Sequence, residues 1–321
     1  MMKILKVAGI IILVLILLAF SAGLYVKTAL PNTGDPSDIK IERTEARVER
    51  GKYLANNVAV CMDCHSSRDW QTFSGPLSGN FGGGGEPFNS EMGFPGNFYA
   101  PNITPASLGT WTDGEVLRAV TTGVSKDGHA LFPVMGYKRF GKMDEEDVLS
   151  IIAYIRTLPP VEHAVPASKA DFPVNFLINT MPEKAAFQPR PAKSDNVAYG
   201  KYLVNVAGCV DCHSKTDKGQ IIDGTEFGGG MEFAQPGGII RSANITFDNT
   251  GIASWTKEAF VKRFKTYTDS TYVPVKLKQG ELNTPMPWSM YAGMEQSDLE
   301  AIYDFLKSVK PIQHKVERVT N

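Results

Sequence analysis

The chain has 321 residues, of which 43% are hydrophobic and 21% charged, and its formal net charge is −1. These values are typical of a globular protein that is long enough for two domains. The sequence has no basic stripe that would neutralise phosphates, so we do not expect nucleic acid as a partner.

The N-terminal segment contains 20 residues without a charge, from Val7 to Val26. As a helix, this run matches the hydrocarbon core of a bilayer, whereas a cleaved signal peptide has an apolar region of roughly 7 to 15 residues. We therefore expect an uncleaved membrane anchor in residues 1–27. Lys3 and Lys6 should keep the N-terminus cytoplasmic. The body is then periplasmic on the inner cell membrane, and a cleaved signal would export it as well.

The rest of the chain repeats itself at long range. GKYL at residue 51 recurs at residue 200, NIT at residue 102 recurs at residue 244, and DVLSIIAYIRTLPPV at residue 147 matches DLEAIYDFLKSVKPI at residue 298. The order is constant, so we expect two tandem domains rather than a solenoid of short repeats. The expected organisation is an anchor (1–27), a tether (28–43), domain 1 (44–160), a Pro-rich linker that packs along a domain surface (161–195), and domain 2 (196–321).

The expected fold is mainly α-helical, because no convincing run of alternating strand residues is present. Each domain should open with a helix, over residues 44–58 and 195–206, and close with another helix. Gly51 and Gly200 fall inside the opening helices, where glycine costs stability, so each should allow a close helix crossing. Three capping signals mark helix starts: Asp195 as an N-cap, and the pairs Thr112–Glu115 and Ser297–Glu300 as capping boxes.

All four cysteines belong to two copies of one motif, CMDCH at residues 61–65 and CVDCH at residues 209–213. Cys-x-x-Cys-His is the attachment signature for c-type haem. A single helical turn puts both thiols on one face, where they can reach two vinyl groups of a porphyrin, and the next residue directs its imidazole at the iron. We therefore expect two covalently attached haem c groups. The predicted residues are Cys61, Cys64 and His65 for one haem, and Cys209, Cys212 and His213 for the other.

Other interpretations of the cysteines explain less of the pattern. A redox disulfide inside each CxxC does not require a histidine in both copies. A zinc site built from four cysteines leaves both histidines unused, and structural disulfides between the domains do not explain the spacing.

The second axial ligand of a cytochrome c haem is commonly methionine. The repeat selects Met135, in FPVMGY, and Met286, in TPMPW, because both precede the last helix of their domain. Each follows a proline closely and has an aromatic residue two positions later. The predicted iron ligands are thus His65, Met135, His213 and Met286. The alternatives Met92, Met143, Met231, Met290 and Met294 are more typical of core packing.

Three further histidines are not among the predicted iron ligands. His129 is a competing ligand for the first haem, but it has no counterpart in domain 2, so we expect a loop position for it. His163 and His314 follow the terminal helices and should face solvent.

Two further repeated features are expected near the haems. The glycines of residues 82–85 lack the Lys-Ser/Thr of a phosphate loop, and we expect them to let the backbone pass close to a haem edge. Asn102 and Asn244 should bond either a haem propionate or the backbone of a loop.

The motifs resemble the class I cytochromes c, and more narrowly the tandem cytochrome c subunits of membrane-bound periplasmic dehydrogenases. The resemblance rests on GKYL…CxxCH, APNIT, GTWTDGEVLRAVTTGVSKDGHALFPVMGY and DEEDVLSIIAYIRTLPPV, and it covers about residues 44–160 and 196–312. It implies low-spin His/Met haems and electron transfer between a quinol or dehydrogenase and an oxidase or soluble carrier. Domain 2 departs from the pattern before Met286, where TDSTYVPVKLKQGELNTPMPW replaces SKDGHALFPVMGY.

Two functions are consistent with these residues. An electron-transfer protein needs two six-coordinate irons and no activity of its own, and it would have a dehydrogenase subunit, an oxidase or a soluble carrier as redox partner. A dihaem enzyme, such as a peroxidase or a sulfur-compound oxidoreductase, needs one open haem site. The chain offers a methionine for each haem and no fifth cysteine, which favours electron transfer.

Overall fold

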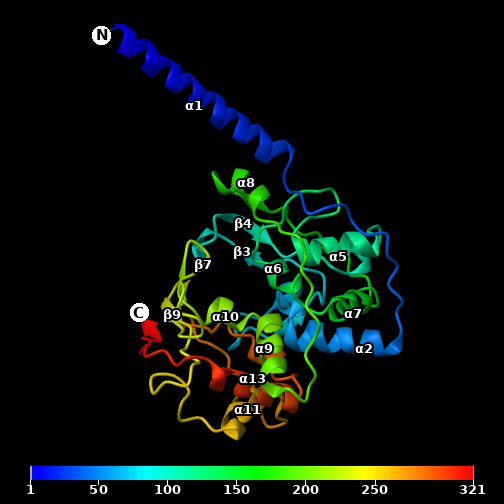
Figure 1. Ribbon diagram of the computed structural model, residues 1–321. Helices are drawn as coiled ribbons and strands as arrows, with labels where there is room; N and C mark the ends of the chain where they lie inside the picture. Colours follow the sequence, from blue (N-terminus) through cyan, green and yellow to red (C-terminus); the bar gives the residue numbers. More distant parts are fainter. Residues whose placement is uncertain (1, 321) are drawn as a thin grey trace.

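A long apolar helix precedes the body of the protein in the computed structural model, which describes residues 2–320. Helix α1 (Met2–Thr28) projects away from the body, and none of its residues is buried (Figure 1). It is the one helix among the described residues that is long and apolar enough to cross a membrane, with a mean hydropathy of 2.9. Its place near the N-terminus is that of an anchor or of a signal sequence.

The first half of the body (residues 44–160) is built on a pair of packed helices, α2 and α7. Thr44 accepts a hydrogen bond from Arg47 as the N-cap of α2, and the predicted Thr112–Glu115 capping box is present at the start of α5. A π-helical turn continues α2, so the predicted helix over 44–58 is confirmed. The helices are α2 (Glu45–Tyr53), η1 (Leu54–Val58), α3 (Cys61–Cys64), η2 (Ser90–Met92), α4 (Pro105–Leu108), α5 (Asp113–Thr122), α6 (Tyr137–Phe140) and α7 (Glu145–Ile155).

The second half of the body (residues 196–320) repeats this plan with the packed pair α9 and α13. Asp195 is the N-cap of α9, as predicted. The predicted Ser297–Glu300 capping box is wrong, because the N-cap position is Glu295, two residues before Ser297, and α13 begins at Gln296. The helices are α9 (Asn196–Ala207), α10 (Cys209–Cys212), α11 (Lys257–Lys265), η4 (Thr266–Thr268), α12 (Trp288–Tyr291) and α13 (Gln296–Ser308).

The two mid-helix glycines lie where the predicted close crossings occur. A Cβ atom on Gly51 would lie 1.8 Å from the Ser150 carbonyl oxygen of α7, and one on Gly200 would lie 2.0 Å from the Ala301 carbonyl oxygen of α13. No other residue type fits such a backbone-to-backbone contact. The prediction from the sequence is therefore confirmed in both halves.

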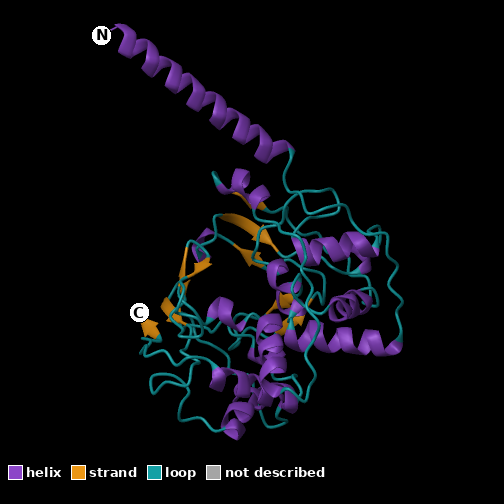
Figure 2. Ribbon diagram, in the orientation of Figure 1, coloured by secondary structure: helices purple, strands orange, loops and turns teal. Residues whose placement is uncertain are grey.

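Short antiparallel strands complete the body at the edges of the helices (Figure 2). They lie mostly in the loops between helices, so the expectation of a mainly helical fold holds although these strands were not predicted. Two sheets have two strands each: β1 (Ser67–Arg68) with β2 (Leu77–Gly79), and β6 (Thr216–Asp217) with β7 (Gln220–Ile221). In one three-stranded sheet, β4 (Gly96–Tyr99) lies between β3 (Pro87–Phe88) and β5 (Lys169–Ala170). In the other, β9 (Gly238–Arg241) lies between β8 (Glu232–Gln235) and β10 (Val319–Thr320).

The connecting segment (residues 161–195) runs along the first half, as the sequence predicted. It contributes β5 to the sheet of β4, and the Ala186 N–H donates to the Gly141 carbonyl at 2.7 Å. Two short turns, α8 (Val174–Leu177) and η3 (Ile178–Thr180), approach the end of α1, where Asn179 donates to the Val26 carbonyl at 3.4 Å.

The two halves share one core and exchange hydrogen bonds. Buried apolar side chains of both form a single continuous cluster. The Tyr53 hydroxyl donates to the Asp298 carboxylate at 2.7 Å, and the Tyr202 hydroxyl donates to the Asp147 carboxylate at 2.6 Å. Because the two tyrosines are equivalent in the repeat, as are the two aspartates, the bonds are reciprocal, as across a two-fold axis.

Candidate haem-binding sites

Each CxxCH motif forms one helical turn, and the two turns have the same geometry. The His65 N–H donates to the Cys61 carbonyl at 3.0 Å, and the His213 N–H donates to the Cys209 carbonyl at 2.9 Å. The residue before each turn is left-handed, with φ of 48° at Val60 and 69° at Gly208. Cysteines three residues apart in such a turn lie on one helix face, which is the arrangement that attachment to one porphyrin edge requires.

The state of the thiols argues against the other interpretations of these cysteines. All four are free thiols in residues 2–320. Burial raises the pKa of Cys61 to about 11 and that of Cys64 to about 12. This direction is opposite to that of redox-active CxxC motifs, whose thiol pKa is lowered. The described residues also contain no group of three or more His, Cys, Asp or Glu side chains that could hold a metal ion such as zinc.

Each motif histidine is oriented by a backbone carbonyl. The Nδ1 atom of His65 lies 2.7 Å from the Pro101 oxygen, and that of His213 lies 2.8 Å from the Ala243 oxygen. Donation from Nδ1 fixes the tautomer in which Nε2 carries a lone pair, as in metal-ligating histidines. Burial lowers the pKa of both imidazoles, which keeps them neutral. The donor set therefore fits a haem iron at both positions.

The glycine loops lie against the segments that carry these carbonyls, and the expected passage of residues 82–85 close to a haem edge stays a prediction. A Cβ atom on Gly84 would lie 2.5 Å from both the Ala100 oxygen and the Pro101 carbonyl carbon, and one on Gly229 would lie 2.3 Å from the Ala243 carbonyl carbon. Both glycines have positive φ, 73° and 70°, which side chains rarely adopt. The glycines thus bring their loop against the segment that orients the histidine.

The repeated asparagines bond the protein backbone, which is one of the two alternatives left open by the sequence. Asn102 donates to the Val161 carbonyl at 2.8 Å, and Asn244 donates to the Ile312 carbonyl at 2.8 Å. In the first half, Thr104 also donates to the Asn102 side chain at 2.7 Å. These bonds tie the loop that orients the histidine to the chain that follows the terminal helix.

His163 and His314 contribute to the same scaffold, so the prediction that they face solvent is wrong. The Nδ1 atom of His163 lies 3.0 Å from the Gly83 oxygen, and that of His314 lies 2.8 Å from the Gly228 oxygen. The sequence could have indicated this shared role, because His163 and His314 are 151 residues apart, the same offset that separates the terminal helices of the two halves. His129 differs, because its side chain is 63% exposed and bonds Asp127 in a loop, as expected.

The two predicted methionines occupy equivalent turns. The Tyr137 N–H donates to the Met135 carbonyl at 2.7 Å, and the Trp288 N–H donates to the Met286 carbonyl at 2.9 Å. Each turn leads directly into a short helix, α6 or α12. Met135 and Met286 are half-buried at the edge of the core. The alternatives differ: Met143, Met290 and Met294 are buried in the core, and Met92 is 50% exposed.

Two arginines pair with the aspartates inside the motifs, one of them across the halves. Arg68 pairs with Asp63 of its own half at 2.9 Å. Asp211 occupies the equivalent position of the second motif but pairs with Arg139 of the first half at 2.8 Å. The guanidinium of Arg139 also lies against Gly208, the residue before Cys209. The second motif therefore lies at the interface between the halves.

Residues 197–310 match the protein-family model described as Cytochrome c. The chain therefore carries a cytochrome c domain, as its motifs predicted, and such a domain implies covalently attached haem with its iron. The match covers the second half, so an independent cytochrome c domain in the first half stays a prediction.

The chain is similar along most of its length to cytochrome c subunits of dehydrogenases. The fructose dehydrogenase cytochrome subunit of Gluconobacter japonicus is 28% identical over 291 residues, which are 85% of this chain and 55% of that protein. The cytochrome c subunit of alcohol dehydrogenase (quinone) from Gluconacetobacter polyoxogenes is 27% identical over 302 residues, 89% of this chain and 59% of that protein. This chain thus spans little more than half of either relative.

The name of a third relative states the number of its haems. The "diheme cytochrome c-type" protein of Cereibacter sphaeroides is 28% identical over 211 residues, which are 63% of this chain and 67% of that protein.

Proposed function

We propose that the chain is a membrane-anchored cytochrome c with two haems, which carries electrons on the periplasmic side of the inner membrane. Helix α1 is the anchor, and residues 44–160 and 196–321 are two cytochrome c domains joined by the linker 161–195. The observation that carries the proposal is the repeated motif geometry, in which each histidine is held through Nδ1 and offers Nε2.

The proposed sites use the same residue types in both halves. Haem iron bound there would alternate between the ferric and ferrous states and so carry one electron at each site. Four cysteines hold the groups covalently, which suits a protein exported from the cytoplasm. The proposed residues are Cys61, Cys64, His65 and Met135 for the first haem, and Cys209, Cys212, His213 and Met286 for the second.

The proposed partner is a dehydrogenase, because the similar proteins are named as subunits of dehydrogenases. In this proposal the dehydrogenase or a quinol gives electrons to the chain, and an oxidase or soluble carrier receives them. The shared core of the halves supports direct passage between the two sites, since it fixes one relative to the other.

The number of haems is tested by removing each attachment motif in turn. The wild-type chain should contain two haems per polypeptide by the pyridine haemochrome assay. The paired variants Cys61→Ala/Cys64→Ala and Cys209→Ala/Cys212→Ala should each contain one and should still stain for haem on a denaturing gel. A variant that retains both haems would refute the assignment of that motif.

The axial ligands are tested by the spectra of the methionine variants. Met135→Ala and Met286→Ala should each convert one haem to a high-spin form and remove its near-infrared methionine–iron band, leaving the other haem unchanged. Met92→Ala is the control and should leave both bands intact. If the wild type already has a high-spin haem that binds cyanide rapidly, the dihaem enzyme replaces the carrier as the better proposal.

A further inference from the structure

The loop that leads to Met286 (residues 269–288) is paired with a loop of the other half (residues 69–76). The Phe73 N–H donates to the Val275 carbonyl at 2.8 Å, and the Leu277 N–H donates to the Gln71 carbonyl at 2.8 Å. Thr72 and Lys276 face each other between these bonds as an antiparallel bridge. The segment of the second half that departs from the repeat is therefore held by the first half.

A buried asparagine, Asn283, joins the two loops at the end of the contact that is nearer to Met286. Asn283 is 7% exposed, and its amide donates to the Trp70 and Thr72 carbonyls at 3.0 Å each. Its side-chain oxygen accepts the Ser74 N–H at 2.8 Å. Since a buried amide that loses its partners costs free energy, these three bonds fix the register of the two loops.

Ser74 forms a hydrogen bond with the predicted ligand residue, Met286. Its hydroxyl donates to the Met286 carbonyl at 2.6 Å and accepts the Trp288 N–H at 3.0 Å. The side chain is buried, with 2% exposure, and the residue has a φ of 66°, a left-handed conformation that is uncommon outside glycine. Such conformations persist only where the surroundings enforce them, and they cluster at functional sites.

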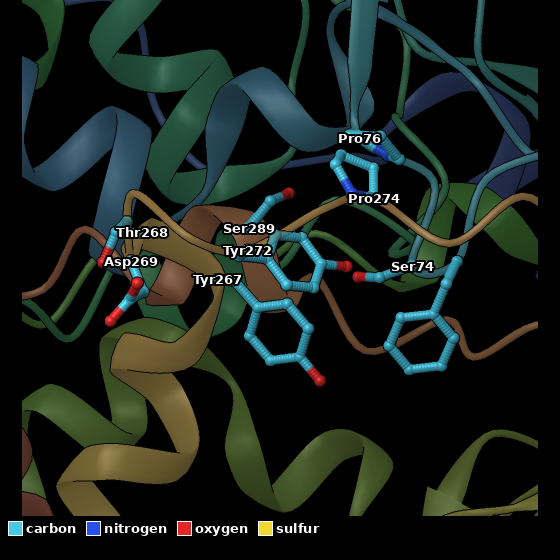
Figure 3. Close-up of a pocket in the computed structure, with 9 residues that line it drawn as sticks. Ser74, Pro76, Tyr267, Thr268, Asp269, Tyr272, Pro274 and Ser289 are labelled. Carbon is cyan, nitrogen blue, oxygen red and sulfur yellow. The ribbon is translucent and has the colours of Figure 1, made fainter.

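Aromatic side chains also take part in the contact, since Phe73 of the first half stacks on Tyr267 of the second half with ring centroids 6.2 Å apart. Phe73, Tyr267 and Tyr272 line a cavity of about 300 Å³ beside Ser74, between the two loops (Figure 3). In the first half, by contrast, the chain before Met135 is fastened within that half, where the Leu131 N–H donates to the Gly123 carbonyl at 2.7 Å.

We propose that Ser74 and Asn283 are positioning residues for the second haem, through which the first half holds Met286 at its iron. This inference rests on the proposed role of Met286 as a ligand. In this proposal, the sixth ligand of the second haem depends on contacts from the half that carries the first haem. Because methionine ligation raises the reduction potential of a haem, loosening this contact should lower the potential of the second haem alone.

The test compares full-length, haem-loaded variants by near-infrared absorption and redox titration. Ser74→Ala, Ser74→Gly and Asn283→Ala should each weaken the methionine–iron band of one haem, lower its potential, and leave the other haem unchanged. Ser74→Gly also relieves the left-handed backbone, so it separates loss of the hydroxyl from strain. Ser125→Ala removes a buried loop hydroxyl of the first half and should keep both bands and both potentials.

Two outcomes distinguish failure of this inference from failure of the proposed function. If Met286→Ala leaves both bands intact, Met286 is not a ligand and the proposed site is wrong. If Met286→Ala removes one band while all three loop variants keep it with unchanged potentials, the positioning role is overturned. A far-UV circular dichroism spectrum and a Tm like those of the wild type show that each loop variant has folded.

Discussion

At the scale of single residues, Asp147 connects three segments of the chain. Its carboxylate is fully buried and accepts two hydrogen bonds from Arg50 at 2.9 and 2.8 Å, one from Arg190 at 2.5 Å and one from Tyr202 at 2.6 Å. Burial raises the pKa of this carboxyl, but the bonds from Arg50 and Tyr202 outweigh it, so the pKa is lowered overall. The ionised form is thus the one that stabilises the fold.

Asp147→Asn should lower the free energy of unfolding at pH 7 by about 3 kcal/mol, because it leaves the buried Arg50 charge without its partner. A carboxyl with a lowered folded pKa contributes stability above its unfolded pKa of about 3.9, and this contribution is lost as the pH falls through the folded pKa. The difference from wild type should therefore shrink between pH 5 and 3 in urea unfolding. Exposed Asp217→Asn is the control, and a difference that does not change with pH would contradict the assignment.

Much of the candidate site could be predicted from the sequence alone, because its residues lie in short motifs. The five residues of each motif specify a helical turn with its histidine, and the repeat then selects Met135 and Met286 as equivalent turns. The carbonyls that orient the histidines were not predicted, because Pro101 and Ala243 lie 36 and 30 residues downstream of His65 and His213. The sequence contains no local signal for such a contact.

At the scale of elements, the glycine crossings decide how tightly the paired helices can approach. Alanine is the better helix former by about 1 kcal/mol, so propensity alone would favour replacing either glycine. The methyl group, however, would lie inside the contact distance of the Ser150 or Ala301 carbonyl. Overpacking against backbone costs more than the propensity gains.

Gly51→Ala and Gly200→Ala should each destabilise the protein by about 3 kcal/mol and lower its Tm, because α2 must move from α7, or α9 from α13. Lys201→Ala is the matched control, since this residue is exposed on α9 next to Gly200 and should change the Tm little. An unchanged Tm in both glycine variants would show that these helix pairs can separate without cost.

Helix starts could be predicted where the capping side chain is close in sequence. The prediction failed where a distant residue takes part in the cap. Thr112 and Glu115 bond each other's backbone, so the capping box could be read directly. At the start of α13, the Glu295 N–H instead donates to the Tyr53 hydroxyl of the other half, at 3.0 Å. At the start of α13, a hydrogen bond to the other half therefore replaces the local cap that Ser297 was predicted to provide.

At the scale of the whole molecule, the halves behave as one folding unit in this structure. The reciprocal bonds from Tyr53 to Asp298 and from Tyr202 to Asp147 join carboxylates whose side chains are fully buried. Hydrogen bonds to charged groups contribute about 1.5–3 kcal/mol each. Together with the shared core, they should make unfolding of the two halves cooperative.

The wild-type protein should therefore unfold in one thermal transition, with haem absorbance and far-UV circular dichroism changing together. Tyr53→Phe and Tyr202→Phe should each cost about 2 kcal/mol. The double variant should separate the two signals into distinct steps, whereas Tyr99→Phe, on β4, should not. Two transitions in the wild type would mean that the halves unfold independently.

The organisation of two halves was visible in the sequence because the repeat preserves order and spacing, whereas their mode of packing was not. Tyr53 and Tyr202 could be aligned from GKYL, yet nothing in that motif indicates that each hydroxyl crosses to the other copy. Contacts between the halves depend on surfaces built from segments far apart in the sequence, and no local pattern indicates them.

The reciprocal tyrosine–aspartate bonds also constrain how the duplicated sequence can change. A substitution at either tyrosine removes a donor from a buried carboxylate in the opposite copy. The compensating change must then arise in the other half, 245 residues away for Tyr53 and Asp298 and 55 residues away for Tyr202 and Asp147. Replacing one half by an unrelated cytochrome c domain would leave such a carboxylate without its donor. The two copies are therefore selected as a pair and are not interchangeable modules.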